Sequence, residues 1–60
     1  MTKDDALAAV KRYAADARLL NAERDKAIVN ARNNGATLRE IGIVAGLSGA
    51  GVAKIIARRG

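Results

Sequence analysis

Two consecutive helix signals enclose a glycine turn in residues 37–55, and this pattern constrains the fold strongly. Thr37 and Glu40 have the T-x-x-E spacing of a capping box, in which each side chain bonds the backbone N–H of the other residue, so a helix is predicted to begin there. Gly46 follows the last apolar residue of that helix, and glycine adopts the left-handed conformation that ends a helix without steric cost. Ser48 is then placed to cap a second helix.

The apolar residues around the turn predict two amphipathic helices that pack together. Their buried faces are predicted to consist of Leu38, Ile41, Ala45, Val52, Ile55 and Ile56. Gly42 lies inside the first helix, where a glycine costs about 1 kcal/mol relative to alanine. We therefore expect a close approach of the second helix at Gly42, where a side chain would hold the two helices apart.

Five scaffold residues carry a resemblance to a known family. They are Gly42, Gly46, Leu47, Val52 and Ile55. With them, residues 37–57 resemble the helix-turn-helix superfamily of bacterial and phage repressors, and are also similar to the C-terminal DNA-binding segments of resolvase-like recombinases. The resemblance implies an all-α fold in which the second helix of the pair enters the major groove of double-stranded DNA.

The same resemblance implies which residues contact DNA. The base-reading positions would be Ser48, Gly49, Ala50, Ala53 and Lys54, with Ala57 beside them. These side chains are small, and only Lys54 is long enough to reach the O6 or N7 atom of a guanine. The phosphate contacts would come from Thr37, Arg39, Arg58 and Arg59.

Positive charge is concentrated in the half of the chain that contains this pattern. Residues 31–60 include five basic side chains and one acidic side chain, for a net charge of +4. Residues 1–30 include six basic and five acidic ones, for a net charge of +1. The asymmetry favours attraction to nucleic-acid phosphates. The alternative interpretation is a basic surface that only keeps a small protein in solution.

The composition argues against several other classes of function. The 60 residues include no cysteine and no histidine, so no thiolate or imidazole is available for a metal site or for acid–base catalysis. We expect no enzyme activity, no catalytic residue, no metal or cofactor and no small-molecule ligand. The apolar runs are far shorter than the roughly 20 residues that cross a membrane. We therefore expect no membrane association and a cytoplasmic protein, associated with the nucleoid of a bacterial cell or infected host.

Residues 2–33 contain neither proline nor glycine and consist mainly of good helix formers, which favours one long helix. A continuous helix over residues 3–33 would be about 46 Å long, whereas a compact globule of 60 residues is roughly 27 Å across. Its N-terminal part is therefore expected to project. This divides the chain into a helical arm over residues 1–22 and a DNA-binding domain over residues 23–60.

An apolar stripe along the arm requires a partner. The stripe consists of Leu7, Val10, Tyr13, Ala14, Ala17 and Leu20. In the favoured arrangement the arm pairs with the same arm of a second molecule, and the two reading helices of this homodimer enter successive major grooves about 34 Å apart. In the other arrangement the chain breaks near residues 20–21 and the stripe packs back on its own chain.

The function expected from these features is sequence-preferring binding of double-stranded DNA. The chain would be a small dimeric transcriptional regulator, a repressor of the phage or mobile-element type. The alternative is a protein-interaction module of the same fold that docks on a host protein through the apolar arm. The scarcity of long side chains on the reading helix keeps this alternative open.

Overall fold

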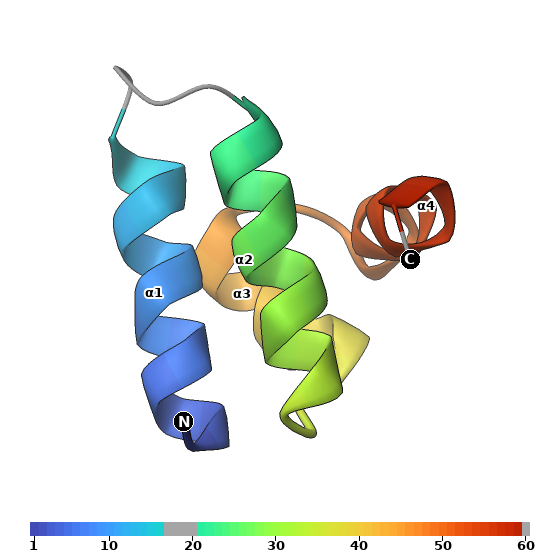
Figure 1. Cartoon of the computed structure of the whole chain (residues 1–60). Helices are drawn as coiled ribbons and strands as arrows, with labels where there is room; N and C mark the ends of the chain where they lie inside the picture. Colours follow the sequence, from blue (N-terminus) through green and yellow to red (C-terminus); the bar gives the residue numbers. More distant parts are fainter. Residues whose placement is uncertain (17–20, 60) are drawn as a thin grey trace.

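The computed structural model describes residues 1–16 and 21–59, and within these ranges the chain forms helices and no strand. The helices are α1 (Lys3–Ala15), α2 (Asn21–Asn33), α3 (Leu38–Ala45) and α4 (Gly49–Arg59). α1 and α2 lie side by side and antiparallel, α3 packs behind them, and α4 lies on the far side of α2 from α1 (Figure 1). The all-α fold class predicted from the sequence is confirmed.

The prediction of one long N-terminal helix is wrong, because α1 ends at Ala15 and α2 begins at Asn21. Asp16 already has an extended backbone, with φ −92° and ψ 101°. α1 packs on α2 and α3, where Ala6 and Val10 are completely buried. Burial of this face outweighs the local preference for an uninterrupted helix, since most helical stability in proteins comes from tertiary packing. As in the second arrangement, the chain breaks and the described part of the stripe packs on its own chain, but α1 already ends at Ala15 and not near residues 20–21.

The described residues of the stripe proposed for dimerisation are buried or half-buried within this chain. Val10 is fully buried, Leu7 and Tyr13 pack partly buried against the same core, Ala14 is half-buried, and Ala17 and Leu20 lie outside the described residues. The described part of the stripe is therefore not a free surface on a projecting arm. One hydrophobic cluster joins α1 to the other three helices, so the division expected after residue 22 does not correspond to a separate core.

The core consists of small and branched aliphatic side chains. Its buried members are Ala6, Val10, Ala27, Ile28, Ala31, Ala36, Ile41, Val52 and Ile55. Alanine supplies 14 of the 30 hydrophobic residues of the chain, so little large apolar area is available for burial. Apolar burial therefore leaves a domain of this size with a small margin of stability.

The capping box expected at the start of α3 is present. The Thr37 hydroxyl accepts the Glu40 N–H at 3.1 Å, and the Glu40 carboxylate accepts the Thr37 N–H at 2.9 Å. Lys3 Nζ lies 3.1 Å from Glu40 Oε2 and links α1 to α3. The hydrogen bond from the Thr37 backbone and then the Lys3 ammonium lower the pKa of the Glu40 carboxyl below its ordinary value of 4.5, because both favour the ionised form.

A left-handed Gly46 ends α3, as the sequence predicts, with φ 72° and ψ 31°. The Gly46 and Leu47 N–H groups both donate to the Gly42 carbonyl. A Cβ atom on Gly42 would lie 2.5 Å from the carbonyl oxygen of Leu47. The close approach expected at Gly42 is therefore present, but its neighbour is the backbone of the turn and not the side of the second helix.

We expect Gly42→Ala to lower the free energy of unfolding by at least about 2 kcal/mol, although alanine is the better helix former by about 1 kcal/mol. The added methyl group would overlap the Leu47 carbonyl oxygen, and backbone yields less readily than a flexible side chain. Urea denaturation followed by circular dichroism measures the change.

The matched control is Gly49→Ala, because a Cβ at Gly49 meets nothing within 4 Å. Its stability should be unchanged or higher by up to about 1 kcal/mol. Equal losses in the two variants would contradict the steric role of Gly42.

Candidate nucleic-acid interface

α3 and α4 form a bent pair joined by a short turn. The chain bends by 103° between Leu38–Ala45 and Gly49–Arg59. The turn between them contains the left-handed Gly46. α4 buries Val52 and Ile55 in its contacts with α2 and α3 and leaves its other side exposed.

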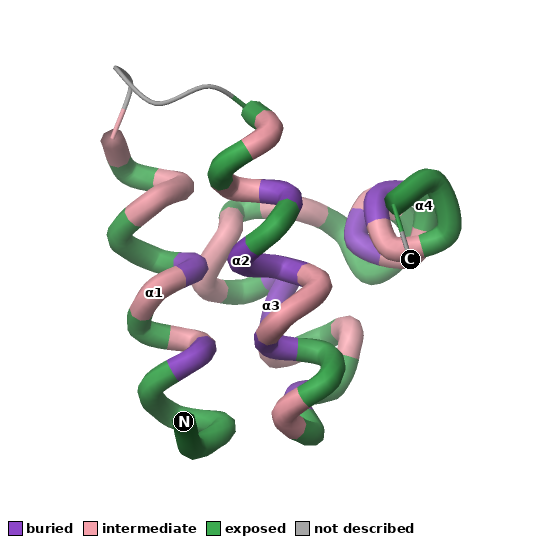
Figure 2. The backbone as a smooth tube through the Cα atoms, in the orientation of Figure 1, coloured by how far each residue is buried: buried purple, intermediate pink, exposed green. Residues whose placement is uncertain are grey.

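The exposed side of α4 faces away from α2 (Figure 2). It comprises the exposed Ser48, Gly49, Ala50, Lys54 and Ala57, with the half-buried Ala53 at its edge. We call these six residues the outward face. The five positions that the resemblance implies for base reading therefore all belong to one surface. Lys54 is the single long side chain among them, so a ligand can approach the backbone of α4 closely.

The start of this face is organised by Ser48, which caps α4 as expected. Its Oγ accepts the Gly51 N–H at 3.0 Å. The hydroxyl hydrogen remains available for an acceptor outside the chain, such as a phosphate oxygen or a base edge. Gly49 has open space around its Cβ position, so packing within the described chain does not require a glycine there.

A buried carboxylate that the sequence analysis missed lies where α2 meets the end of α4. Asp25 is 2% exposed. Its Oδ1 lies 3.2 Å from Arg24 Nη2, and its Oδ2 lies 3.2 Å from Arg58 Nη2 and 3.4 Å from Arg59 Nε. One carboxylate thus faces three guanidinium groups, and the cluster has a net charge of +2. We call these four residues the Asp25 cluster.

Burial of a carboxylate is tolerated only where charges and hydrogen bonds replace water. All three arginines supply charge to Asp25, and Arg24 and Arg58 also donate hydrogen bonds to it. The sequence contains a weak signal for this arrangement. Asp25 precedes the buried Ile28 by three residues, which places both on one side of α2. An acidic residue in such a position needs a cationic partner, but Arg58 is 33 residues away and only the fold brings it close.

Arg58 and Arg59, which the resemblance implies as phosphate contacts, are thus already bonded within the chain. Their side chains nevertheless remain 68% and 37% exposed. A guanidinium group has five N–H donors, so each arginine retains donors beyond those used at Asp25. Asp25 therefore holds two exposed cations in place at the end of α4.

Further cations lie on α2 and α3. The exposed Lys26, which the sequence analysis did not single out, lines a shallow pocket with Val29 and Arg59 beside the Asp25 cluster. At the start of α3, Thr37 and Arg39 are exposed as expected. The Thr37 hydroxyl is engaged in the capping box, whereas Arg39 forms no ion pair with any described residue.

The described residues contain no group of three His, Cys, Asp or Glu side chains that could hold a metal ion. No single helix in residues 1–16 and 21–59 is long and apolar enough to cross a membrane. α3 and α4 together pass that test by length and composition alone, and they are bent by 103° relative to each other.

No family model matches this chain, and neither a curated protein nor a solved structure is detectably similar to it. The role of the outward face must therefore be inferred from the geometry and charge of the chain itself.

Replacing Asp25 by asparagine should lower the free energy of unfolding by about 2–3 kcal/mol, because three arginines lose their shared anion while a polar side chain stays buried. Glu23→Gln is the matched control, since Glu23 is exposed on the same helix and its loss should cost less than about 1 kcal/mol. Urea denaturation compares the two. If Asp25→Asn lowers the free energy of unfolding no more than Glu23→Gln does, the Asp25 cluster does not hold α4 on α2.

Proposed function

We propose that this chain binds double-stranded DNA and inserts the outward face of α4 into the major groove. The observation that carries the proposal is the shape of this face, which combines small residues with one lysine and belongs to a helix set at 103° to α3. The major groove is about 12 Å wide and admits an α-helix. Small residues along the exposed side let the backbone of α4 come close to the base edges.

Base reading by this face would rest on few contacts. Lys54 would donate to the O6 or N7 atom of a guanine, Ala50 and Ala53 would touch thymine methyl groups, and Ser48 would donate to a base edge or a phosphate. None of these is the bidentate contact that Arg, Asn or Gln makes with a base. We therefore expect modest discrimination among DNA sequences.

Most of the affinity would come from the phosphate backbone. Arg39 on α3 and Lys26 on α2 are exposed cations, and the Asp25 cluster adds a net charge of +2 at the end of α4. Because Asp25 already orders Arg58 and Arg59, these side chains would lose less conformational entropy on binding a phosphate than free arginines do.

The alternative function, docking on a host protein through an apolar arm, receives less support. It requires an exposed stripe along α1, whereas Val10 is fully buried and Leu7 packs against the core of the same chain. DNA binding uses surfaces that are exposed in the folded chain. The proposed role is regulation of transcription by occupying a DNA site, which would place the protein with DNA inside the cell.

Salt titrations of binding to labelled DNA duplexes test the proposal. Arg39→Ala should weaken binding to all duplexes about equally and reduce the slope of log affinity against log salt by about 1, because one phosphate contact is lost. Lys54→Ala should reduce the spread of affinities among duplexes of different sequence. Fluorescence anisotropy measures both quantities.

Lys11→Ala is the control, because Lys11 is an exposed cation on α1, and α1 makes no contact with α4 among the described residues. This variant should leave the salt dependence of the affinity, and the spread of affinities among duplexes, close to those of the unmodified chain. The proposal fails if that chain does not bind duplexes at micromolar concentration in low salt. It also fails if the Arg39 and Lys54 variants behave like the Lys11 control.

A further inference from the structure

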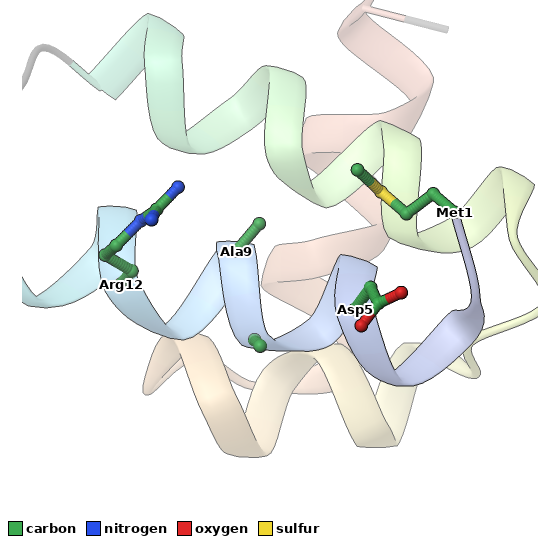
Figure 3. Close-up of a pocket in the computed structure, with 5 residues that line it drawn as sticks. Met1, Asp5, Ala9 and Arg12 are labelled. Carbon is green, nitrogen blue, oxygen red and sulfur yellow. The ribbon is translucent and has the colours of Figure 1, made fainter.

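The exposed side of α1 carries a row of four residues whose spacing i, i+3, i+4, i+7 places them on one side of the helix. They are the exposed Asp5, Ala8 and Arg12 and the half-buried Ala9. With Met1 they line a shallow groove of about 330 Å³. In Figure 3, Asp5, Ala9 and Arg12 follow one another along α1, and Met1 lies on the side toward α2. We call these four α1 residues the α1 row.

The two charges of the α1 row are not neutralised within the described chain. The Asp5 carboxylate accepts a long hydrogen bond from the Thr2 N–H, at 3.4 Å. The Arg12 guanidinium lies over the Tyr13 ring, 5.2 Å from its centroid. Neither contact is an ion pair, and both charged side chains are exposed. The row therefore presents one carboxylate and one guanidinium group to a partner.

The α1 row is symmetric about the midpoint between Ala8 and Ala9, because Asp5 and Arg12 lie equally far from this point along the helix. A two-fold axis through the midpoint generates a second α1 that runs antiparallel to the first. Arg12 of each copy then lies opposite Asp5 of the other copy, which gives two equivalent ion pairs. Between these pairs, Ala8 and Ala9 of one copy contact Ala8 and Ala9 of the other. Such a contact uses the same surface on both copies and is complementary to itself.

We propose that two copies of this chain associate through the α1 rows in an antiparallel two-fold contact. Alanine side chains let helix axes approach to about 8 Å, near the lower limit for packed helices. The contact would also cover Met1, which is 76% exposed. It leaves the outward face of α4 free, because α4 lies beyond α2 and has no contact with α1 among the described residues (Figure 1).

This interface differs from the one expected from the sequence, and it is small. Leu7, Val10 and Tyr13 of the apolar stripe lie in or against the core, whereas the α1 row lies on the other side of the same helix. A helix of 13 residues is about 20 Å long, and one pair of such helices buries less than the roughly 1,200 Å² of a stable interface. We therefore expect a dissociation constant on the order of 0.1–1 mM.

Charge reversal within the row tests the proposal by sedimentation equilibrium at protein concentrations up to about 1 mM. Arg12→Asp leaves two carboxylates in the row and should weaken self-association about tenfold, because both ion pairs become repulsive. Asp5→Arg leaves two cations and should have the same effect. A mixture of the two single variants should associate, and the double variant should regain self-association, since both restore opposite charges across the two-fold axis.

Lys11→Asp is the matched control, because it makes the same change in net charge at an exposed position outside the row. It should change self-association by less than about twofold. Asp5 also contributes to the cap of α1, so circular dichroism checks that each variant is folded, and the comparison of Arg12→Asp with Lys11→Asp does not involve that cap.

Three results would overturn the proposal. The first is an unmodified chain that stays monomeric at about 1 mM, which would leave the groove open to a different kind of partner. The second is an equal loss of self-association in Arg12→Asp and Lys11→Asp. The third is a failure of two folded single variants to associate with each other.

Discussion

The contact between Gly42 and the Leu47 carbonyl sets the direction in which α4 leaves α3. A Cβ atom would lie 2.5 Å from that oxygen, so every residue larger than glycine displaces the turn. The left-handed Gly46 completes the reversal, and the two helices differ in direction by 103°. The orientation of the outward face relative to the rest of the molecule follows from these few backbone atoms.

The other end of α4 is held by charge. The core consists of alanines and small aliphatic side chains, so apolar burial alone does little to fix one arrangement of the helices. The Asp25 carboxylate joins α2 to the last turn of α4 through Arg58 and Arg59. A buried ion pair adds little net stability when its desolvation is costly, but removing one partner leaves an uncompensated buried charge and is strongly destabilising. Here it also leaves two ordered cations beside the outward face.

Helix caps and turns were predictable from the sequence where the residues that form them lie within about one helical turn of each other. The capping box at Thr37, the left-handed Gly46 and the Ser48 cap each involve residues no more than four positions apart, and all three are present. The base-reading positions that the resemblance implied also lie together on the outward face of α4. The break after Ala15 and the burial of Asp25 were not predictable, because both depend on partners in other helices that are distant in the sequence.

The proposed binding mode is tested most directly by mapping chemical-shift changes of the backbone amides when an isotope-labelled chain is titrated with duplex DNA. We expect the largest changes at Ala50, Ala53 and Lys54 on α4, smaller ones at Arg39 on α3, and little change along the exposed side of α1. Changes confined to α1 would contradict it, as would a spectrum unchanged with protein and DNA at about 100 µM in low salt.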